Sequence, residues 1–317
     1  MRSEVAKSKK SGLGVGIRRE LTKNKYIYIM AIPVILYYLI FCYWPMFGLV
    51  IAFKQYEIGK GILASDWVGF KYFIEFFKSV NFKRLMSNTL GISLYDLLAG
   101  FPAPIIFALL LNEITNTRFK KVVQTVTYLP HFISLVVICG IITDFFATEG
   151  FITKLLSVFG MEKRNYLGEP QYFKTIYVLT NIWQSIGWGS IIYLAALSGI
   201  NPDLYEAADV DGANRFRKII SITLPGIAPT IMIMLIMRLG QLMSVGFEKI
   251  ILLYNPSTYE TADVISSFVY RRGLGESAQY SYTTAVGMFQ SVINLVLLMG
   301  ANYFSTKFSG TGLFEIK

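Results

Sequence analysis

The stretch NPDLYEAADVDGANRFRKIISITLP, residues 201–225, is the most polar long segment in the second half of a chain that is otherwise mostly apolar. Asn201 suits the N-cap of a helix, and Pro202 suits its first helical position. Asp203 and Glu206 fall in the first turns, where the helix dipole favours negative charge. Basic residues follow nearer the other end: Arg215, Arg217 and Lys218. The segment is therefore predicted to be a short helix whose charges suit its own dipole.

The chain around this segment has the composition of a membrane protein. Of its 317 residues, 54% are hydrophobic and 16% charged, and the mean hydropathy is +0.49. A soluble domain carries about 25% charged residues. Runs of about 20 apolar residues can cross a bilayer, and only helices satisfy their own backbone groups there. We predict an all-α polytopic bundle of six transmembrane helices, over residues 27–52, 88–111, 122–146, 176–200, 226–252 and 284–303.

The net charge of +10 is unevenly spread along the chain. Residues 1–25 hold eight Lys or Arg against two Glu, which is typical of a cytoplasmic flank attracted to anionic lipid headgroups. No basic patch interleaved with aromatic residues is present, so we expect no nucleic-acid partner. The predicted organisation is a cytoplasmic tail over 1–25, a transmembrane domain over 26–306 and a cytoplasmic C-terminal tail over 307–317.

The distribution of charge between the loops tests this orientation. With both termini inside, about 75 residues lie inside with sixteen Lys or Arg, and about 95 lie outside with twelve. The higher inside density agrees with the positive-inside rule and predicts that residues 201–225 face the cytoplasm. Arg271 and Arg272 then fall in the outer loop before the last span, where solvated charges are expected.

Signals of catalysis are lacking in the sequence. Cys42 and Cys139 lie inside apolar runs and are expected to be structural thiols. His131 is the only histidine, and one imidazole does not make a metal site. No phosphate-binding loop occurs, and GLGVG at residues 12–16 lies in the polar tail, where it is interpreted as a linker. We predict no catalytic residue, no metal site and no cofactor in this chain.

Residues 201–225 have a second notable pattern. Ala208 and Gly212 lie four positions apart, hence on one face of a helix, where a second protein could approach the backbone closely. Glu206 and Asp209 would supply polar contacts beside them. The segment is therefore predicted to be a docking helix. The alternatives from the residues alone are an amphipathic helix at the membrane surface and a solvated loop with a good cap.

One resemblance favours docking. The segment resembles the EAA motif of the membrane subunits of binding-protein-dependent ABC importers. The matching positions are Glu206, Ala207, Ala208, Gly212, Ile222, Leu224 and Pro225. A second stretch, YWPMFGLVIAFKQY at 43–56 with DWVGFKYFIEFF at 66–77, resembles the start of the sugar-permease branch, most closely the LplB-type oligosaccharide permeases.

The resemblance implies a type I ABC importer permease fold in a bacterial plasma membrane. It implies four partners besides lipid: a second, related permease, two cytoplasmic ATPase subunits that bind ATP and Mg²⁺, and an extracellular or periplasmic solute-binding protein that delivers an oligosaccharide. It also implies that residues 201–225 form the coupling helix on the ATPase. The implied coupling residues are Glu206, Ala207, Ala208, Asp209, Gly212, Leu224 and Pro225.

Polar residues at mid-span are candidates for the substrate path, because hydrocarbon disfavours them. They form one stripe on each of three spans, with amides for hydroxyl recognition and an aromatic ring on which a sugar can lie. The candidates are Asn181, Gln184 and Trp188 in span four, Arg238 and Gln241 in span five, and Gln290 and Asn294 in span six. The alternative is that they hold helices together by interhelical hydrogen bonds.

Arg238 needs a partner at mid-membrane. Asp96 and Glu248 are internal candidates, and an acidic sugar is the functional alternative. The alternative class of function is an ion- or proton-coupled secondary transporter that works without an ATPase. Such transporters commonly have internal repeats and acidic residues at the midplane, and neither is clear in this sequence.

Overall fold

The computed structural model of the chain describes residues 23–275 and 278–314. The described part is mostly helical, which confirms the predicted all-α class. One small hairpin interrupts it, in which β1 (Lys54–Gln55) pairs antiparallel with β2 (Asp66–Trp67) around the short helix α4 (Gly61–Ala64). Most of the basic N-terminal tail, including the predicted linker at 12–16, lies outside the described residues.

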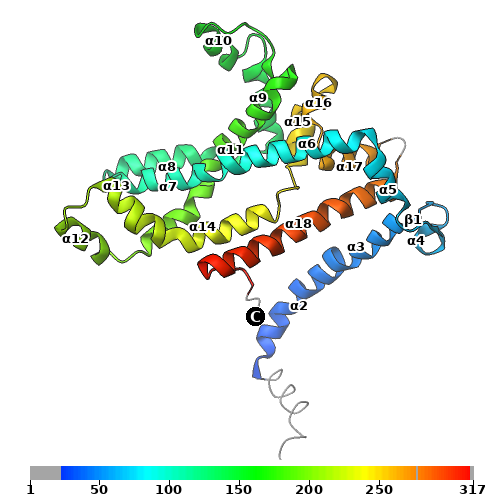
Figure 1. Cartoon of the computed structure of the whole chain (residues 1–317), viewed down its shortest axis with the longest axis horizontal. Coiled ribbons are helices and arrows are strands. Elements are labelled where there is room, and N and C mark those ends of the chain that lie inside the picture. The colour runs from blue at the N-terminus through cyan, green and yellow to red at the C-terminus, as the bar shows by residue number, and fades with distance from the viewer. Residues whose placement is uncertain (1–22, 276–277, 315–317) are drawn as a thin grey trace, which may run out of the picture.

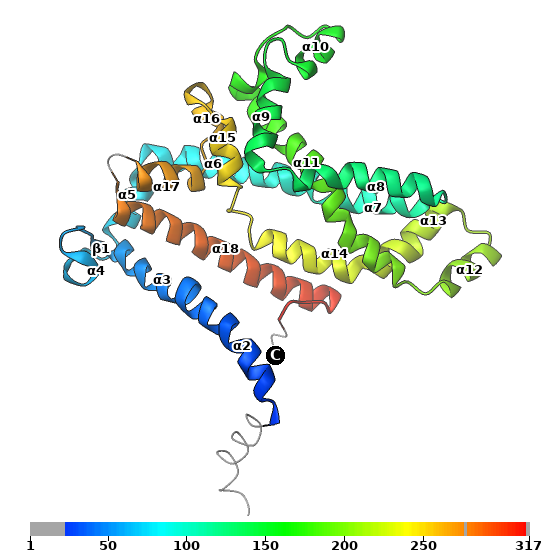
Figure 2. The same cartoon turned by 180° about the vertical axis from the view of Figure 1, so that it is seen from behind.

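The first span stands apart from the bundle. It runs through α2 (Lys25–Tyr37), the π-helical η1 (Tyr38–Tyr43), α3 (Trp44–Met46) and the 3₁₀ segment η2 (Phe47–Phe53). Figure 1 and Figure 2 show that α2 diverges from the other helices while the far end of this span meets the start of α18. None of the side chains in α2 is buried. Its apolar surface is the kind that lipid or another membrane protein covers.

The second span is longer than predicted. After α5 (Lys71–Lys78), the chain continues through α6 (Val80–Tyr95), the π-helical turn η3 (Asp96–Gly100) and α7 (Pro102–Glu113). Pro102 and Pro104 lack the backbone N–H groups that a regular helix would donate here. The Phe101 N–H instead reaches back five residues to the Asp96 carbonyl, at 3.1 Å. The wide turn therefore follows from the prolines.

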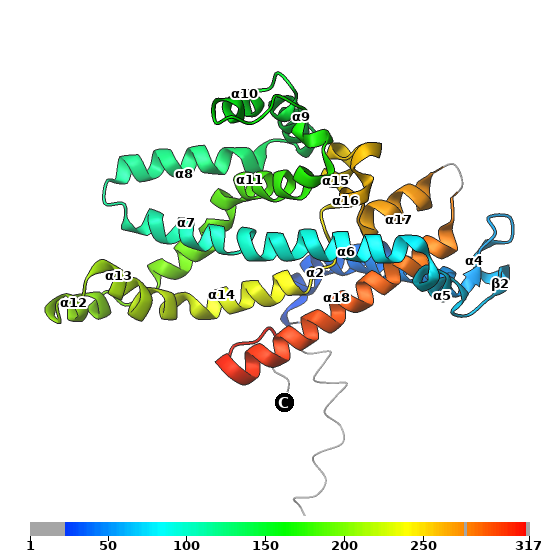
Figure 3. The same cartoon turned by 45° about the horizontal axis from the view of Figure 1, so that its top comes forward.

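The third predicted span, 122–146, is wrong as a single helix. The chain forms α8 (Thr117–Phe132) and α9 (Leu135–Phe146), separated by two extended residues, and then α10 (Phe151–Val158). Pro130 lies just before the break, and the Ser134 hydroxyl accepts a bond from the Val137 N–H at 3.4 Å to start the new helix. Figure 3 shows the chain turning away from the direction of α8 at α9.

The fourth span, α11 (Pro170–Ser198), is the central helix of the bundle. It packs on both α7 and α8, and its close approach to α8 depends on a glycine. A Cβ at Gly187 would lie 2.3 Å from the Thr127 carbonyl oxygen, so a larger residue does not fit. Small residues at such crossings let membrane helices approach closely.

The fifth predicted span, 226–252, is also broken. Helix α14 (Leu224–Leu239) ends before an irregular stretch at 240–246, and α15 (Phe247–Leu253) follows it. Short elements η6 (Pro256–Thr258), α16 (Tyr259–Ala262) and α17 (Ile265–Leu274) lead to α18 (Tyr280–Ser309), the last span. The chain then folds back, because the buried Asn302 side chain accepts a hydrogen bond from the Leu313 N–H at 2.7 Å.

Within the described residues, five helical stretches are long and apolar enough to cross a membrane, rather than the six predicted. They are Lys25–Phe53, Val80–Glu113, Leu135–Val158, Arg215–Leu239 and Tyr280–Lys307. Helix α11 is long enough at 29 residues but is not among them. Its amides and small polar residues, the features that suggested a substrate path, lower its hydropathy.

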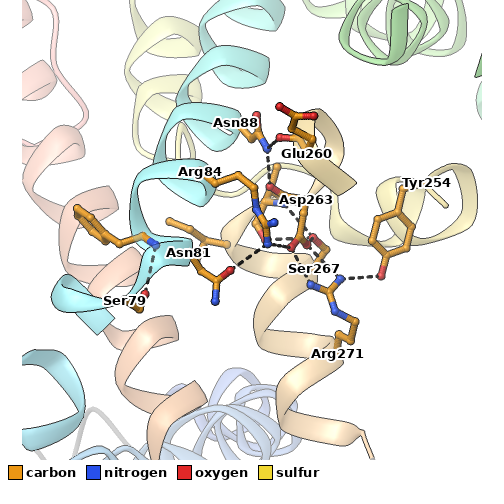
Figure 4. A network of polar contacts seen from close by, with 12 residues as sticks. Ser79, Asn81, Arg84, Asn88, Tyr254, Glu260, Asp263, Ser267 and Arg271 are labelled. Atoms are coloured by element: carbon orange, nitrogen blue, oxygen red, sulfur yellow. Dashed lines mark hydrogen bonds and ion pairs between the residues drawn. The ribbon is translucent and has the colours of Figure 1, made fainter. Parts of the chain in front are cut away.

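A polar network ties α6 to α16 and α17 (Figure 4). Its centre is Asp263, which is fully buried. Arg271 donates to both carboxylate oxygens of Asp263, at 3.1 and 2.7 Å, and Arg84 of α6 approaches at 3.4 Å. The Asn88 amide donates to the Asp263 carbonyl at 3.1 Å. Arg271 was expected to be a solvated loop charge, and that prediction is wrong.

The surroundings of Asp263 keep Arg271 charged. Burial by itself lowers the pKa of the Arg271 guanidinium, but the hydrogen bonds and the charge of Asp263 outweigh it and raise that pKa above its ordinary value. The Ser267 hydroxyl also donates to Asp263, at 2.8 Å. All the groups around the carboxylate are thus donors, and the network fixes the entry of span two against the segment that precedes the last span.

Removal of this carboxylate should destabilise the protein. Losing one partner of a fully buried ion pair costs roughly 3–5 kcal/mol. Since both guanidinium groups reach water in part, we expect Asp263→Ala to lower the free energy of unfolding by about 2–3 kcal/mol. The measurement is denaturant-induced unfolding of the purified chain in detergent micelles. Glu149→Ala, which removes an exposed partner of Lys154, is the control and should stay within about 1 kcal/mol.

Candidate functional site

The segment at residues 201–225 forms two helices and not one. Helix α12 (Asp203–Val210) ends in a tight turn, and α13 (Arg215–Lys218) starts after it and continues through the π-helical η5 (Ile219–Thr223) into α14. Figure 1 shows α12 at one end of the molecule, far from α10, α16 and α4. The expected helix is therefore a short protruding hairpin of two helices.

Gly212 lies in the turn that ends α12. Its φ is +70°, a left-handed conformation that glycine adopts without strain. The Ala213 N–H bonds to the Ala208 carbonyl at 2.9 Å and the Gly212 N–H to the Asp209 carbonyl at 3.1 Å, which is the Schellman pattern that ends a helix. The prediction that Ala208 and Gly212 share a helical face is wrong, because the helix ends between them.

The hairpin is braced by its own side chains. The Asn201 carboxamide oxygen accepts from the Asp203 N–H at 3.1 Å, as a capping residue would. The Lys218 ammonium pairs with Asp209 across the turn, and the Tyr205 hydroxyl bonds to that of Thr223 at 3.0 Å. Asp209 thus forms an ion pair within the hairpin.

The tip of the hairpin presents groups that a partner could use. Val210 is 89% exposed and Phe216 is 70% exposed, so both apolar side chains are uncovered here. Glu206 lies exposed on α12, and no bond of its side chain to another described residue is found. The braced hairpin therefore carries two carboxylates for which no side-chain partner is found among the described residues, Glu206 and Asp211, together with two exposed apolar groups.

A second feature lies in the centre of the bundle, where two adjoining cavities meet. Their volumes are about 830 and 220 Å³. Both are lined by Asp96, Asn181, Arg238 and Gln241. Three different spans thus place polar side chains at one point, and three of the four residues were predicted for the substrate path from the sequence.

Arg238 forms an ion pair with Asp96, so the internal partner proposed for it is confirmed. The Asn181 amide donates to the same carboxylate at 3.0 Å, which links α11, η3 and α14. A Cβ at Gly100 would lie 2.7 Å from the Asp96 carboxylate, so this close arrangement requires glycine there. The Asp96 side chain is 6% exposed and that of Arg238 is 43% exposed. The pair therefore turns its positive side to the open space.

Trp188 lines the larger cavity, as an aromatic platform should. Its indole stacks on the His131 ring, with centroids 4.6 Å apart and planes 5° apart, and Phe132 meets it edge-on. His131 thus covers one face of the platform, and it reaches Trp188 because α8 ends there. No local pattern predicts this pairing, since the two residues lie 57 positions apart in the sequence.

Three of the predicted path residues are not brought to the cavities. Gln184 is not among their lining residues. Asn294 accepts from the Met243 N–H at 2.9 Å, and Gln290 donates to the Met243 carbonyl at 2.8 Å. These are the interhelical bonds of the alternative interpretation, and they hold the irregular stretch at 240–246. Tyr177, which does line the smaller cavity, was missed because a tyrosine among apolar residues carries no distinctive signal.

The sequence matches the model of a known family over residues 100–310, described as the binding-protein-dependent transport system inner membrane component. The chain belongs to this family. Its members are multi-pass membrane components of ABC importers and not enzymes, and ATP is hydrolysed by separate subunits. The family supports an ATP-driven importer over the ion-coupled alternative, and it confirms the resemblance drawn from the EAA motif.

Two individual relatives are similar to this chain over more than nine-tenths of its length. The permease is 43% identical over 305 residues to protein LplB of Bacillus subtilis, with 96% of each chain covered. It is also 43% identical over 296 residues to the polygalacturonan/rhamnogalacturonan transport system permease YteP of the same organism, covering 93% of this chain and 92% of YteP.

Solved structures agree in fold. The permease superposes with a TM-score of 0.85 and 45% identity on a chain of a bacterial ABC transporter involved in the import of the acidic polysaccharide alginate, covering 92% of this chain and 99% of the other. It matches equally well, with the same score and identity over 93% and 99%, a bacterial alginate ABC transporter in complex with an alginate pentasaccharide-bound periplasmic protein.

The turn at Gly212 generates a prediction about local stability. Alanine in a left-handed conformation costs about 1–2 kcal/mol, so Gly212→Ala should speed hydrogen exchange of the amides in α12 about 5- to 30-fold. Gly212→Asn should change it less, because asparagine tolerates this conformation. Gly59→Ala, at an exposed glycine without close neighbours, serves as the control and should leave exchange in α12 unchanged. Equal exchange in Gly212→Ala and the wild type would contradict the role of the turn.

Proposed function

We propose that this chain is one of two membrane subunits of a bacterial importer that moves an acidic oligosaccharide, delivered by a solute-binding protein, through the central cavities. The observation that carries the proposal is the combination of a braced, protruding hairpin with a polar cavity whose exposed charge is a guanidinium. Two ATPase subunits binding ATP with Mg²⁺ supply the energy, and both termini of the chain are cytoplasmic.

The hairpin of α12 and α13 is the element that the ATPase grips. Val210 and Phe216 offer apolar surface to a cleft, and Glu206 offers a charge. Because α13 continues through η5 into α14, a displacement of the hairpin moves the helix that carries Arg238. A partner can shift the bundle between two arrangements only through its different affinity for each, so the hairpin has to be rigid.

The acidic character of the substrate rests on the charge in the cavity. Arg238 exposes its guanidinium to the open space while Asp96 is almost covered. Arginine matches the geometry of a carboxylate and binds it with two parallel hydrogen bonds. The alginate importer and the polygalacturonan/rhamnogalacturonan permease agree with this choice, since both are named for acidic polysaccharides. The Trp188 ring supplies an apolar face for the sugar.

Charge reversal in the hairpin tests coupling. Glu206→Lys places a cation where the partner meets a carboxylate, so we expect ATP hydrolysis stimulated by the loaded binding protein to fall at least tenfold while assembly of the complex is kept. The measurement is ATPase activity of the purified complex in nanodiscs. Glu113→Lys, an exposed glutamate at the end of α7, is the matched control and should retain stimulation. Full stimulation of ATP hydrolysis in the Glu206→Lys complex would contradict the coupling role.

Recognition of an acidic substrate is tested by changing the ion pair in the cavity. Asp96→Asn combined with Arg238→Gln removes both charges and leaves no unpaired ion behind. We expect uptake of oligogalacturonate by cells carrying this double variant to fall roughly tenfold or more. Uptake of a neutral oligosaccharide of the same length should change by less than about threefold. Equal loss for both sugars would instead assign the pair to holding the helices together.

A further inference from the structure

Lys249 in α15 is a buried cation without a polar partner. Its residue is 4% exposed, and the ammonium makes no hydrogen bond or ion pair with any other part of the chain that the structure describes. The ammonium lies over the ring of Tyr177, whose centroid is 5.3 Å from the nitrogen. A cation over an aromatic ring gains about 0.5–2 kcal/mol.

The stabilisation from this contact is small compared with the free-energy cost of burying the ammonium. An ion removed from water loses several kcal/mol of solvation, and buried charges in proteins are accordingly paired. The two buried carboxylates described above follow this rule, since Asp263 is paired with two arginines and Asp96 with one. The exception at Lys249 points to an anion that is supplied from outside the chain.

The position of Lys249 shows from where that anion can come. Tyr177 contacts the ammonium and also lines the smaller cavity, together with Asp96 and Arg238. Val245 and Gly246, which precede α15, line the same cavity, and Lys249 lies about one helical turn beyond Gly246. A Cβ at Gly246 would lie 3.2 Å from the Tyr177 hydroxyl, so this stretch packs directly against the ring. Tyr177 is therefore in contact with both the cation and the cavity.

We propose that Lys249 is a second carboxylate-binding group of the substrate path, which pairs with a uronate carboxylate when the Tyr177 side chain turns aside. The ligand class is an oligosaccharide of uronic acids, which carries more than one carboxylate. Arg238 takes one of them and Lys249 takes another farther along the path. This inference rests on the proposed function and adds to it a site on α15.

The test uses the complete complex in nanodiscs with its binding protein, and trigalacturonate as the probe. Lys249→Met keeps the length of the side chain and removes its charge, whereas Lys249→Arg keeps the charge. We expect Lys249→Met to lower the maximal stimulated rate of ATP hydrolysis at least tenfold. The concentration of loaded binding protein at half-maximal stimulation should not change, because docking is untouched. Lys249→Arg should stay within about threefold of the wild type.

The controls separate a binding role from a structural one. Lys174→Met removes a half-buried lysine from α11, which carries Tyr177, at a position that does not line either cavity, and should behave as the wild type. A Lys249→Met complex with a full stimulated rate overturns the inference and leaves the proposed function intact. So does a Lys249→Met complex that loses thermal stability and basal activity to the same extent as Lys249→Arg. If trigalacturonate does not stimulate ATP hydrolysis by the wild-type complex with its binding protein, both the acidic substrate and this site are overturned.

Discussion

The inability of hydrocarbon to hydrogen-bond a backbone governs this structure. Wherever the helices break, side chains replace the missing partners. The Ser134 hydroxyl starts α9 after the extended residues, and Asn294 and Gln290 bond both backbone groups of Met243 in the irregular stretch of the fifth span. The smaller cavity lies at such interruptions, because residues of the irregular stretch at 240–246 and Asp96 of the wide turn line it.

The charges of the bundle follow from the same constraint. Asp96 lies in the wide turn that Pro102 and Pro104 impose, and the turn brings its carboxylate to α11 and α14. Three spans are thereby joined at one ion pair. Because the covered side of that pair is the acid and the open side is the base, the constraint on burial also sets the sign of the charge that faces the cavity.

The fold class and the main parts of the site could be predicted from the sequence, but their geometry could not. Composition and the EAA motif indicated a membrane bundle of the binding-protein-dependent importer family, and polarity at mid-span picked out Asn181, Trp188, Arg238 and Gln241, all of which line the cavities. The breaks after Phe132 and Leu239 were missed, since an apolar run shows no gap where tertiary hydrogen bonds replace helical ones. The stacking of His131 on Trp188 depends on such a break, and pairings across distant residues leave no local pattern.

The left-handed turn at Gly212 has a mechanical consequence. A flexible loop at that point would absorb an applied force by bending, and the membrane helices would stay still. The Schellman bonds and the pairing of Lys218 with Asp209 instead lock the two arms at a fixed angle. A force applied to the tip by the ATPase that we propose as its partner would therefore be passed on to α14 and not absorbed at the turn.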